Sequence, residues 1–197
     1  MLRNTLKSWG DLTRGLHWFT ALLILVQIPL GFYMVDAYET YKVDWADDTV
    51  FMRASLWHNT LGFIVLLVVV VRLIWRATNV SPDLPSQLQT YQRWLARLTH
   101  GFLYLLLIIY PLSGWAALSA YEFEFPIFFF GWDSVPGIVP KVAEGAGTFD
   151  YPFFADIHKA CWRLGAVVLG LHVIAAVWHQ WVQKDGVLVR MWKGGPE

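Results

Sequence analysis

Four long stretches of this chain are apolar and free of charged residues. They run from Gly15 to Val35, Ala54 to Val71, Leu98 to Tyr121 and Leu164 to Gln183. A helix of about 20 apolar residues crosses the hydrocarbon core of a bilayer. The pattern therefore predicts an all-α integral membrane protein, a bundle of four transmembrane helices. Allowing for the flanking residues, we place the spans at about 12–36, 54–77, 93–120 and 156–184 of one domain covering residues 1–197.

The polar segments between these stretches differ in the sign of their charge. Basic residues flank the two ends of the chain and the connection between the second and third spans: Arg3, Lys7, Arg14, Arg72, Arg76, Arg93, Arg97, Lys184, Arg190 and Lys193. The other two connections are mostly acidic, with Asp36, Glu39, Asp44, Asp47, Asp48, Glu122, Glu124, Asp133, Glu144, Asp150 and Asp156. Because cytoplasmic loops are enriched in Lys and Arg, we predict cytoplasmic N- and C-termini.

Two connections are long enough to have structure of their own. The segment from Ser81 to Gln89 contains two prolines and predicts an ordered cytoplasmic turn. The segment 121–155 is rich in Gly, Pro and aromatic residues, so we expect it to lie as a cap across the outer face without a further span.

Composition agrees with a membrane protein. Of the 197 residues, 56% are hydrophobic and 15% are charged, and the formal net charge is zero. We expect contact with membrane lipid and no nucleic-acid partner. The single cysteine, Cys161, excludes an intrachain disulfide and a metal cage built from cysteines. The N-terminal apolar stretch is too long for a cleaved signal peptide, so we interpret it as a retained span.

The histidines add the candidate chemistry. His158, Gly165, His172 and His179 recur every seven residues, which places them along one stripe of a helix. His158 and His172 would stand about 21 Å apart at a rise of about 1.5 Å per residue. Ionisable residues inside a membrane are functional candidates by default, and imidazoles on one stripe suggest binding of metal or haem.

The predicted topology gives each histidine a depth. His58 and His158 fall near the outer side and pair naturally as two axial ligands of one b-type haem. On the inner side, His172 has two candidate partners, His17 and His100, and depth alone does not choose between them. His179 competes for the same partners. Two haems stacked in this way would let electrons cross most of the bilayer.

Small and cationic residues near the histidines support this interpretation. Small residues let a porphyrin or another helix approach closely, and cations can pair with haem propionates. Candidates of the first kind are Gly62 and Gly165. Candidates of the second kind are Arg53, Lys159 and Arg163 on the outer side and Arg14, Arg72, Arg93 and Arg97 on the inner side. The simpler alternative, polar residues at a membrane interface, is strongest for His100 and His179 and for Arg14 and Arg97.

These residues resemble the bacterial cytochrome b561 family, which shares a domain with the cytochrome b subunits of nickel–iron hydrogenases. The resemblance rests on Arg14–Trp18, Trp57–Gly62, Arg72–Arg76, Leu98–His100, Tyr110–Trp115, His158–Lys159, His172, His179 and Lys184–Leu188, and it covers essentially the whole chain. It implies a four-helix protein of the bacterial inner membrane with two haem b groups. Position by position, it assigns His17 with His172 to the inner haem and His58 with His158 to the outer haem.

The resemblance also implies a function. His100 and His179 would remain as non-ligands near the inner haem, where ubiquinone could bind. The short four-helix form is most similar to the superoxide oxidase type, which takes electrons from superoxide outside and reduces ubiquinone. The acidic outer connections disagree with an anionic substrate and favour a cationic partner. The alternative is therefore a haem-bearing membrane anchor of a periplasmic dehydrogenase or of a cytochrome c chain. A small proton channel or transporter whose histidines relay protons is a third, weaker hypothesis.

Overall fold

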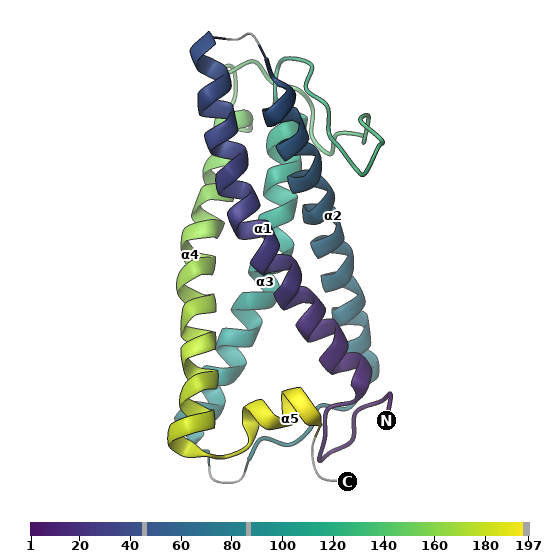
Figure 1. Cartoon of the computed structure of the whole chain (residues 1–197), viewed down its shortest axis with the longest axis vertical. Coiled ribbons are helices and arrows are strands. Elements are labelled where there is room, and N and C mark those ends of the chain that lie inside the picture. The colour runs from purple at the N-terminus through teal and green to yellow at the C-terminus, as the bar shows by residue number, and fades with distance from the viewer. Residues whose placement is uncertain (45–46, 86–87, 195–197) are drawn as a thin grey trace. The chain divides into compact units, whose positions relative to one another are not determined.

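The chain is all-helical along its membrane-spanning length. The computed structural model describes residues 1–44, 47–85 and 88–194. Its elements are α1 (Asp11–Asp44), α2 (Thr49–Thr78), α3 (Thr90–Ala120), α4 (Tyr151–Trp178), a π-helical turn η1 (His179–Gln183) and a short α5 (Val187–Lys193) (Figure 1). Among the described residues, four helices are long and apolar enough to cross a membrane, so the predicted all-α fold with four spans is confirmed.

The four long helices exceed what a membrane requires. Their 28–34 residues correspond to about 42–51 Å at about 1.5 Å per residue, against a hydrocarbon core of about 30 Å. Helices satisfy every backbone hydrogen bond internally, which hydrocarbon demands. Large apolar side chains along α4, including Leu164, Val167 and Ile174, are about 60% exposed, as expected of a lipid-facing surface.

The described helices start earlier or end later than the sequence placed the spans. The fourth spanning helix starts at Tyr151, within the segment predicted as cap, and continues through η1 to Gln183. Helix α2 starts at Thr49, where Asp47 acts as its cap by accepting a hydrogen bond from the Thr49 N–H at 2.9 Å. Hydrogen bonds from the Thr49 side chain and backbone hold the pKa of Asp47 below its ordinary value.

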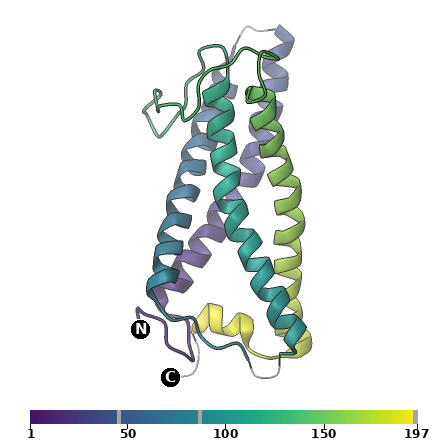
Figure 2. The same cartoon turned by 180° about the vertical axis from the view of Figure 1, so that it is seen from behind.

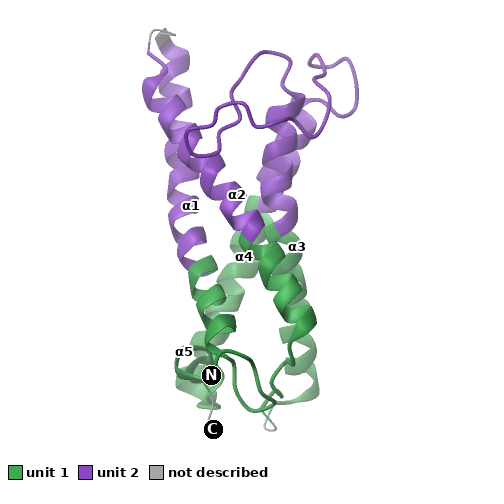
Figure 3. Cartoon of the chain, turned by 90° about the vertical axis from the view of Figure 1, so that its right-hand side faces the viewer, with its two compact units in different colours: residues 1–20, 68–107, 162–197 green, residues 21–67, 108–161 purple. Residues whose placement is uncertain are grey.

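The chain divides into two compact units, each built from parts of all four long helices. One comprises residues 1–20, 68–107 and 162–197, and we call it the basic unit; the other comprises residues 21–67 and 108–161, and we call it the acidic unit (Figure 3). Both ends of the chain and the connection 79–89 belong to the basic unit. Both acidic connections belong to the acidic unit. The predicted turn Ser81–Gln89 is described except for Ser86 and Gln87, which lie outside the described residues.

In the acidic unit, small side chains let the helices approach one another. The buried residues of α3 are Ser113, Ala116, Ala117, Ser119 and Ala120, and Ala54, Ser55 and Thr60 of α2 are equally buried. Small residues at such contacts are typical of membrane helices, where van der Waals packing drives association.

The segment 121–150 is an irregular loop where α3 ends and α4 begins (Figure 2). It carries two isolated β-bridges and no helix. Three side chains fasten it to the helices. The Phe130 N–H donates to Thr60 Oγ1 at 2.8 Å, the Trp115 indole donates to the Pro136 carbonyl at 3.0 Å, and the Ile138 N–H donates to Ser119 Oγ at 3.1 Å.

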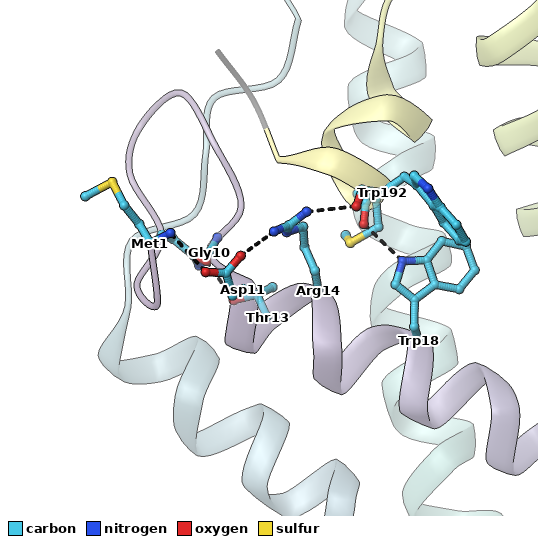
Figure 4. Close-up of polar contacts among 9 residues, drawn as sticks. Met1, Gly10, Asp11, Thr13, Arg14, Trp18 and Trp192 are labelled. Carbon is cyan, nitrogen blue, oxygen red and sulfur yellow. Dashed lines mark hydrogen bonds and ion pairs between the residues drawn. The ribbon is translucent and has the colours of Figure 1, made fainter. Parts of the chain in front are cut away.

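In the basic unit, the first residues of the chain fold back onto the start of α1, where the Asp11 N–H donates to the Met1 carbonyl at 2.9 Å, and the first turns of α1 contact α5. Arg14 forms an ion pair with Asp11 and donates to the Trp192 carbonyl at 2.8 Å, and the Trp18 indole donates to the Met191 carbonyl at 3.0 Å (Figure 4). The Trp18 and Trp192 rings meet edge to face, with centroids 4.9 Å apart. These contacts hold α5 against the start of α1.

Replacing Thr60 with Val should loosen the loop 121–150. The Thr60 side chain is fully buried, and the isosteric change leaves the Phe130 N–H without its acceptor, at a cost of about 1–3 kcal/mol. We expect a lower thermal midpoint and faster proteolysis within 121–150 in detergent. Thr40→Val is the matched control, because among the described residues the exposed Thr40 hydroxyl bonds only to the Asp36 carbonyl of its own helix. Equal stability of the two variants would refute the anchoring role of Thr60.

Candidate functional site

Two histidines from different helices face each other in the acidic unit. His58 of α2 and His158 of α4 have ring centroids 6.3 Å apart, with their planes at 74°. Both side chains are only partly accessible. These are the two histidines that the sequence paired on the outer side.

The orientation of His158 is fixed by the backbone of α3. Its Nδ1 lies 2.9 Å from the Tyr110 carbonyl oxygen. Because a carbonyl only accepts, Nδ1 carries the proton and Nε2 is left with a lone pair. Ser113 completes this corner: its hydroxyl donates to the same carbonyl at 2.7 Å and lies 3.2 Å from Nδ1. A metal-binding histidine commonly donates its other N–H to such an acceptor.

His58 has a side-chain amide beside it instead of a carbonyl. Gln27 of α1 donates through Nε2 to the His58 carbonyl at 2.9 Å, and the same nitrogen lies 3.2 Å from His58 Nδ1. Three buried polar atoms near this part of α2 have no hydrogen-bond partner among the described residues: Gln27 Oε1, Ser55 Oγ and Asn59 Nδ2. Buried polar atoms without partners are costly, so this side of the pair has bonding capacity for a further group.

Two glycines, which have no side chain, let the imidazole rings approach the helix backbone closely. A methyl group added at Gly114 would lie 2.9 Å from Cε1 of His158, and one added at Gly31 would lie 3.3 Å from Cε1 of His58. Gly62, the glycine expected near His58, is close to Gln27 instead, with its added methyl 3.7 Å from Nε2. At Gly165 an added methyl would meet no described atom within 4 Å.

The basic unit contains a second pair with the same spacing. The ring centroids of His17 of α1 and His172 of α4 are 6.3 Å apart, with their planes at 64°. His100 of α3 also approaches His172, but at 5.4 Å. The His100 Nδ1 lies 2.6 Å from the Ala96 carbonyl of its own helix. The sequence left His17 and His100 as alternative partners of His172, and in the structure these two histidines lie at different distances from the His172 ring.

The spacing of 6.3 Å fits two imidazoles on opposite sides of one metal ion. A metal–imidazole bond of about 2.0–2.1 Å and a distance of about 1.1 Å from Nε2 to the ring centre give a centroid separation of about 6.3 Å. A separation of 5.4 Å is too short for that arrangement. Among the described residues, no three His, Cys, Asp or Glu side chains gather to hold a bare ion. Pairs of imidazoles fit haem, whose porphyrin supplies the other four nitrogens.

The predicted cations differ in their surroundings. Lys159 pairs with Asp156 at 3.3 Å, and Arg14 is engaged with Asp11 and Trp192. Arg53 and Arg163 are exposed, and Arg163 belongs to the basic unit rather than to the unit of His58 and His158. In the basic unit, the Arg72 guanidinium lies 5.3 Å from the centre of the Tyr104 ring.

His179 is held by a carboxylate. Its Nδ1 lies 2.5 Å from Asp185 Oδ2, in the segment where η1 ends and the chain turns toward α5. The sequence grouped His179 with the stripe of His158 and His172, but the π-helical turn starts at His179 itself.

Sequence reasoning missed the groups that orient the imidazoles: Gln27, Gly31, Tyr110, Ser113, Gly114 and Asp185. Tyr110, Ser113 and Gly114 stood in a motif that carried the family resemblance, without a role. The Tyr110 group is a backbone carbonyl, which any residue type supplies, so no pattern of residue types could identify it. Gln27 is the one amide inside the first apolar stretch, and this isolation was an available signal.

Comparisons with known proteins cover nearly the whole chain. The sequence profile described as prokaryotic cytochrome b561 matches residues 8–194. The chain is 28% identical over 190 residues to cytochrome b561 homolog 2 of Escherichia coli (strain K12), covering 95% of this chain and 93% of that protein. It is 27% identical over 192 residues to the probable superoxide oxidase CybB of Yersinia pestis, covering 94% of this chain and 96% of that protein.

The family match agrees with the four apolar helices and the paired imidazoles. Members of this family are b-type cytochromes that take part in electron transfer in the membrane. The four spanning helices and the bacterial relatives place the protein in the bacterial inner membrane as a multi-pass protein. The chain therefore belongs to the prokaryotic cytochrome b561 family.

Proposed function

We propose that this protein binds two b-type haems and carries electrons across the inner membrane between a donor outside the cytoplasm and ubiquinone. His58 and His158 would hold one haem, and His17 and His172 the other. The observation that carries this proposal is the repeated spacing: each pair has centroids 6.3 Å apart. The spacing of 5.4 Å between His100 and His172 supports His17 as the partner of His172.

We further propose that the acidic unit faces the outside and that both termini lie in the cytoplasm. The connection 79–89 and both ends of the chain belong to the basic unit, and Lys and Arg near the ends of spans favour the cytoplasmic side. Arg72, which lies over Tyr104, is then a candidate to compensate haem propionate charge on the inner side.

Bound haem supplies reversible one-electron chemistry. The chain's own residues would orient the ligand histidines and keep other histidines from coordinating the iron. The Tyr110 carbonyl keeps the proton on His158 Nδ1, which leaves Nε2 free to coordinate. Gly31 and Gly114 leave space for the two imidazoles of the acidic unit. His100, tied to the Ala96 carbonyl, would remain a non-ligand beside His172.

Two kinds of donor remain, and the charge distribution favours the second. The relative named as a probable superoxide oxidase supports superoxide as a donor. In the acidic unit, however, three of the four cations are engaged in ion pairs: Lys42 with Glu39, Lys141 with Glu124 and Lys159 with Asp156, and only Arg53 lacks one among the described residues. An excess of unpaired carboxylates would repel an anion and attract a cationic protein. The second candidate is therefore a membrane anchor that exchanges electrons with a periplasmic dehydrogenase or a c-type cytochrome.

Removing one ligand should remove one haem. We expect His58→Ala and His17→Ala each to lower the haem-to-protein ratio from about two to about one, because each substitution breaks one axial pair. His100→Ala should keep both haems. The ratio is measured by the pyridine haemochrome assay on purified protein with reduced-minus-oxidised spectra. Loss of a haem from His100→Ala, or full occupancy in His17→Ala, would contradict the proposed pairs.

Gly114→Ala should disturb the His158 site without removing a ligand. The added methyl would lie 2.9 Å from Cε1 of His158 and 3.1 Å from Nδ1, so the ring must move away from the Tyr110 carbonyl. We expect about 10-fold weaker binding of that haem, within the usual effect of groups that support a ligand. Gly170→Ala is the matched control, since its methyl meets no described atom within 4 Å. Haem titration into the apoprotein compares the two, and equal affinities would refute the steric role of Gly114.

The two donors can be separated with purified, haem-loaded protein. Superoxide and a quinone analogue are supplied together, and quinol formation is followed with and without a basic c-type cytochrome. Fast turnover without the cytochrome supports superoxide oxidation. If only the cytochrome exchanges electrons, and does so about 10-fold faster at low than at physiological ionic strength, the protein is an anchor for a cationic partner.

A further inference from the structure

The His179–Asp185 pair lies at a break in the helical chain that the haem sites do not use. The Asp185 side chain is only 3% exposed and that of His179 is 19% exposed. Both carboxylate oxygens are occupied: Oδ2 bonds to His179 Nδ1 at 2.5 Å, and Oδ1 accepts the Val187 N–H at 3.1 Å. Burying a carboxylate in a membrane protein costs free energy unless the carboxylate is paired. Asp185 is paired with His179 and with the Val187 N–H.

An unbroken α-helix could not bring these two residues together. Six residues correspond to about 9 Å along the axis and about 240° around it, which places their side chains on different faces. Here η1 widens the helix from His179 to Gln183, and Lys184 and Gly186 then adopt left-handed conformations, with φ of 54° and 76°. Left-handed backbone at a residue other than glycine and π-helical turns both concentrate at functional sites. The π-helical turn and the left-handed residues together bend the backbone so that the side chains of His179 and Asp185 meet.

The geometry assigns the proton of the imidazole. An ionised carboxylate only accepts hydrogen bonds, so His179 Nδ1 carries the hydrogen that Asp185 accepts. The other nitrogen, Nε2, bonds to no described residue. An imidazole oriented in this way takes up a proton at Nε2 and gives it away again, while the carboxylate stabilises the charged form.

A polar pocket adjoins the pair. Its volume is about 220 Å³, and it is lined by Gln89, Gln92, Gln183, Lys184 and Asp185. Three amides, an ammonium group and a carboxylate make it suitable for ordered water, which needs two to four polar partners. Asp185 is thus shared between the pocket and His179.

We propose that His179 and Asp185 form a proton-transfer pair that delivers protons from this pocket to the quinone. This inference rests on the proposed function. Reduction of a quinone to a quinol takes up two electrons, which the cytochrome supplies, and two protons. The His179 Nε2–H bond breaks as an O–H bond forms on a quinone oxygen, and a proton from bulk solvent, relayed by water in the pocket, then returns to Nε2. A second such cycle supplies the second proton. Asp185 acts as a positioning residue through its hydrogen bond with His179 Nδ1.

His100 is the natural comparison within the same unit. Its Nδ1 is occupied by a backbone carbonyl of its own helix, and no described carboxylate is bonded to it. A neutral carbonyl stabilises the charged imidazole less than a carboxylate does. The charged, proton-carrying form of the ring is therefore better supported at His179 than at His100.

The test compares two electron acceptors in chemically reduced, haem-loaded protein. Decylubiquinone takes up protons with its electrons, whereas ferricyanide takes up electrons alone. We expect His179→Gln and Asp185→Asn to slow oxidation by decylubiquinone by about 10²-fold, the usual contribution of general acid–base catalysis, and to leave oxidation by ferricyanide unchanged. The solvent deuterium isotope effect should rise in both variants with decylubiquinone only. Asp83→Asn, an exposed carboxylate of the same unit, is the matched control and should behave as wild type.

The outcomes are distinguishable. Equal slowing with both acceptors, or an altered haem spectrum in both variants, would mean that the pair only supports the fold. Wild-type rates with decylubiquinone in both variants would refute the proton-transfer role of His179 and Asp185, while the proposed reduction of quinone would stand. A wild-type protein that reduces ferricyanide but not decylubiquinone would refute the quinone assignment, and the role of the pair with it.

Discussion

An imidazole inside a membrane that acts as a ligand or carries a proton must keep one nitrogen free while its other nitrogen is satisfied, and His158 and His179 meet this constraint. Unpartnered polar atoms in hydrocarbon cost several kcal/mol, so a ring that is held there needs a partner that hydrocarbon cannot provide. For His158 the Tyr110 carbonyl does this and for His179 the Asp185 carboxylate, while His58 has the Gln27 Nε2 group 3.2 Å from its Nδ1. The glycines, the small side chains of α3 and the break after α4 all follow from bringing these partners within reach.

The two units meet this constraint differently. In the acidic unit both paired rings have a polar neighbour at Nδ1, whereas no described residue bonds to His17 or His172. A hydrogen bond donated from Nδ1 makes the ligand more basic and favours the oxidised iron. With haem bound as proposed, the bond from His158 Nδ1 to the Tyr110 carbonyl would act in this way on one ligand of the acidic unit.

Much of the fold was readable from the sequence because hydrocarbon restricts the choices. Charge-free stretches such as Leu164 to Gln183 had to become helices, and the four spans are confirmed. The seven-residue recurrence predicted that His158 and His172 share one helix, and both lie on α4. The pairing of His58 with His158 as haem ligands remains a prediction, which the distance between the two rings supports. What could not be read depends on backbone geometry. The reversal after Gln183 requires left-handed backbone at Lys184, and neither it nor the short α5 had a periodic signal. Gly114 became informative only when the structure brought His158 beside it.

The contact between α5 and the start of α1 has a consequence for biogenesis. Arg14 and Trp18 belong to the first of the four spanning helices, but their acceptors are the carbonyls of Trp192 and Met191, which follow the fourth (Figure 4). All four spans must therefore be synthesised before these two donors reach their final partners. Closure of the basic unit therefore waits for the synthesis of α5, and a chain that stalls before α5 leaves that end of the protein open to quality-control proteases.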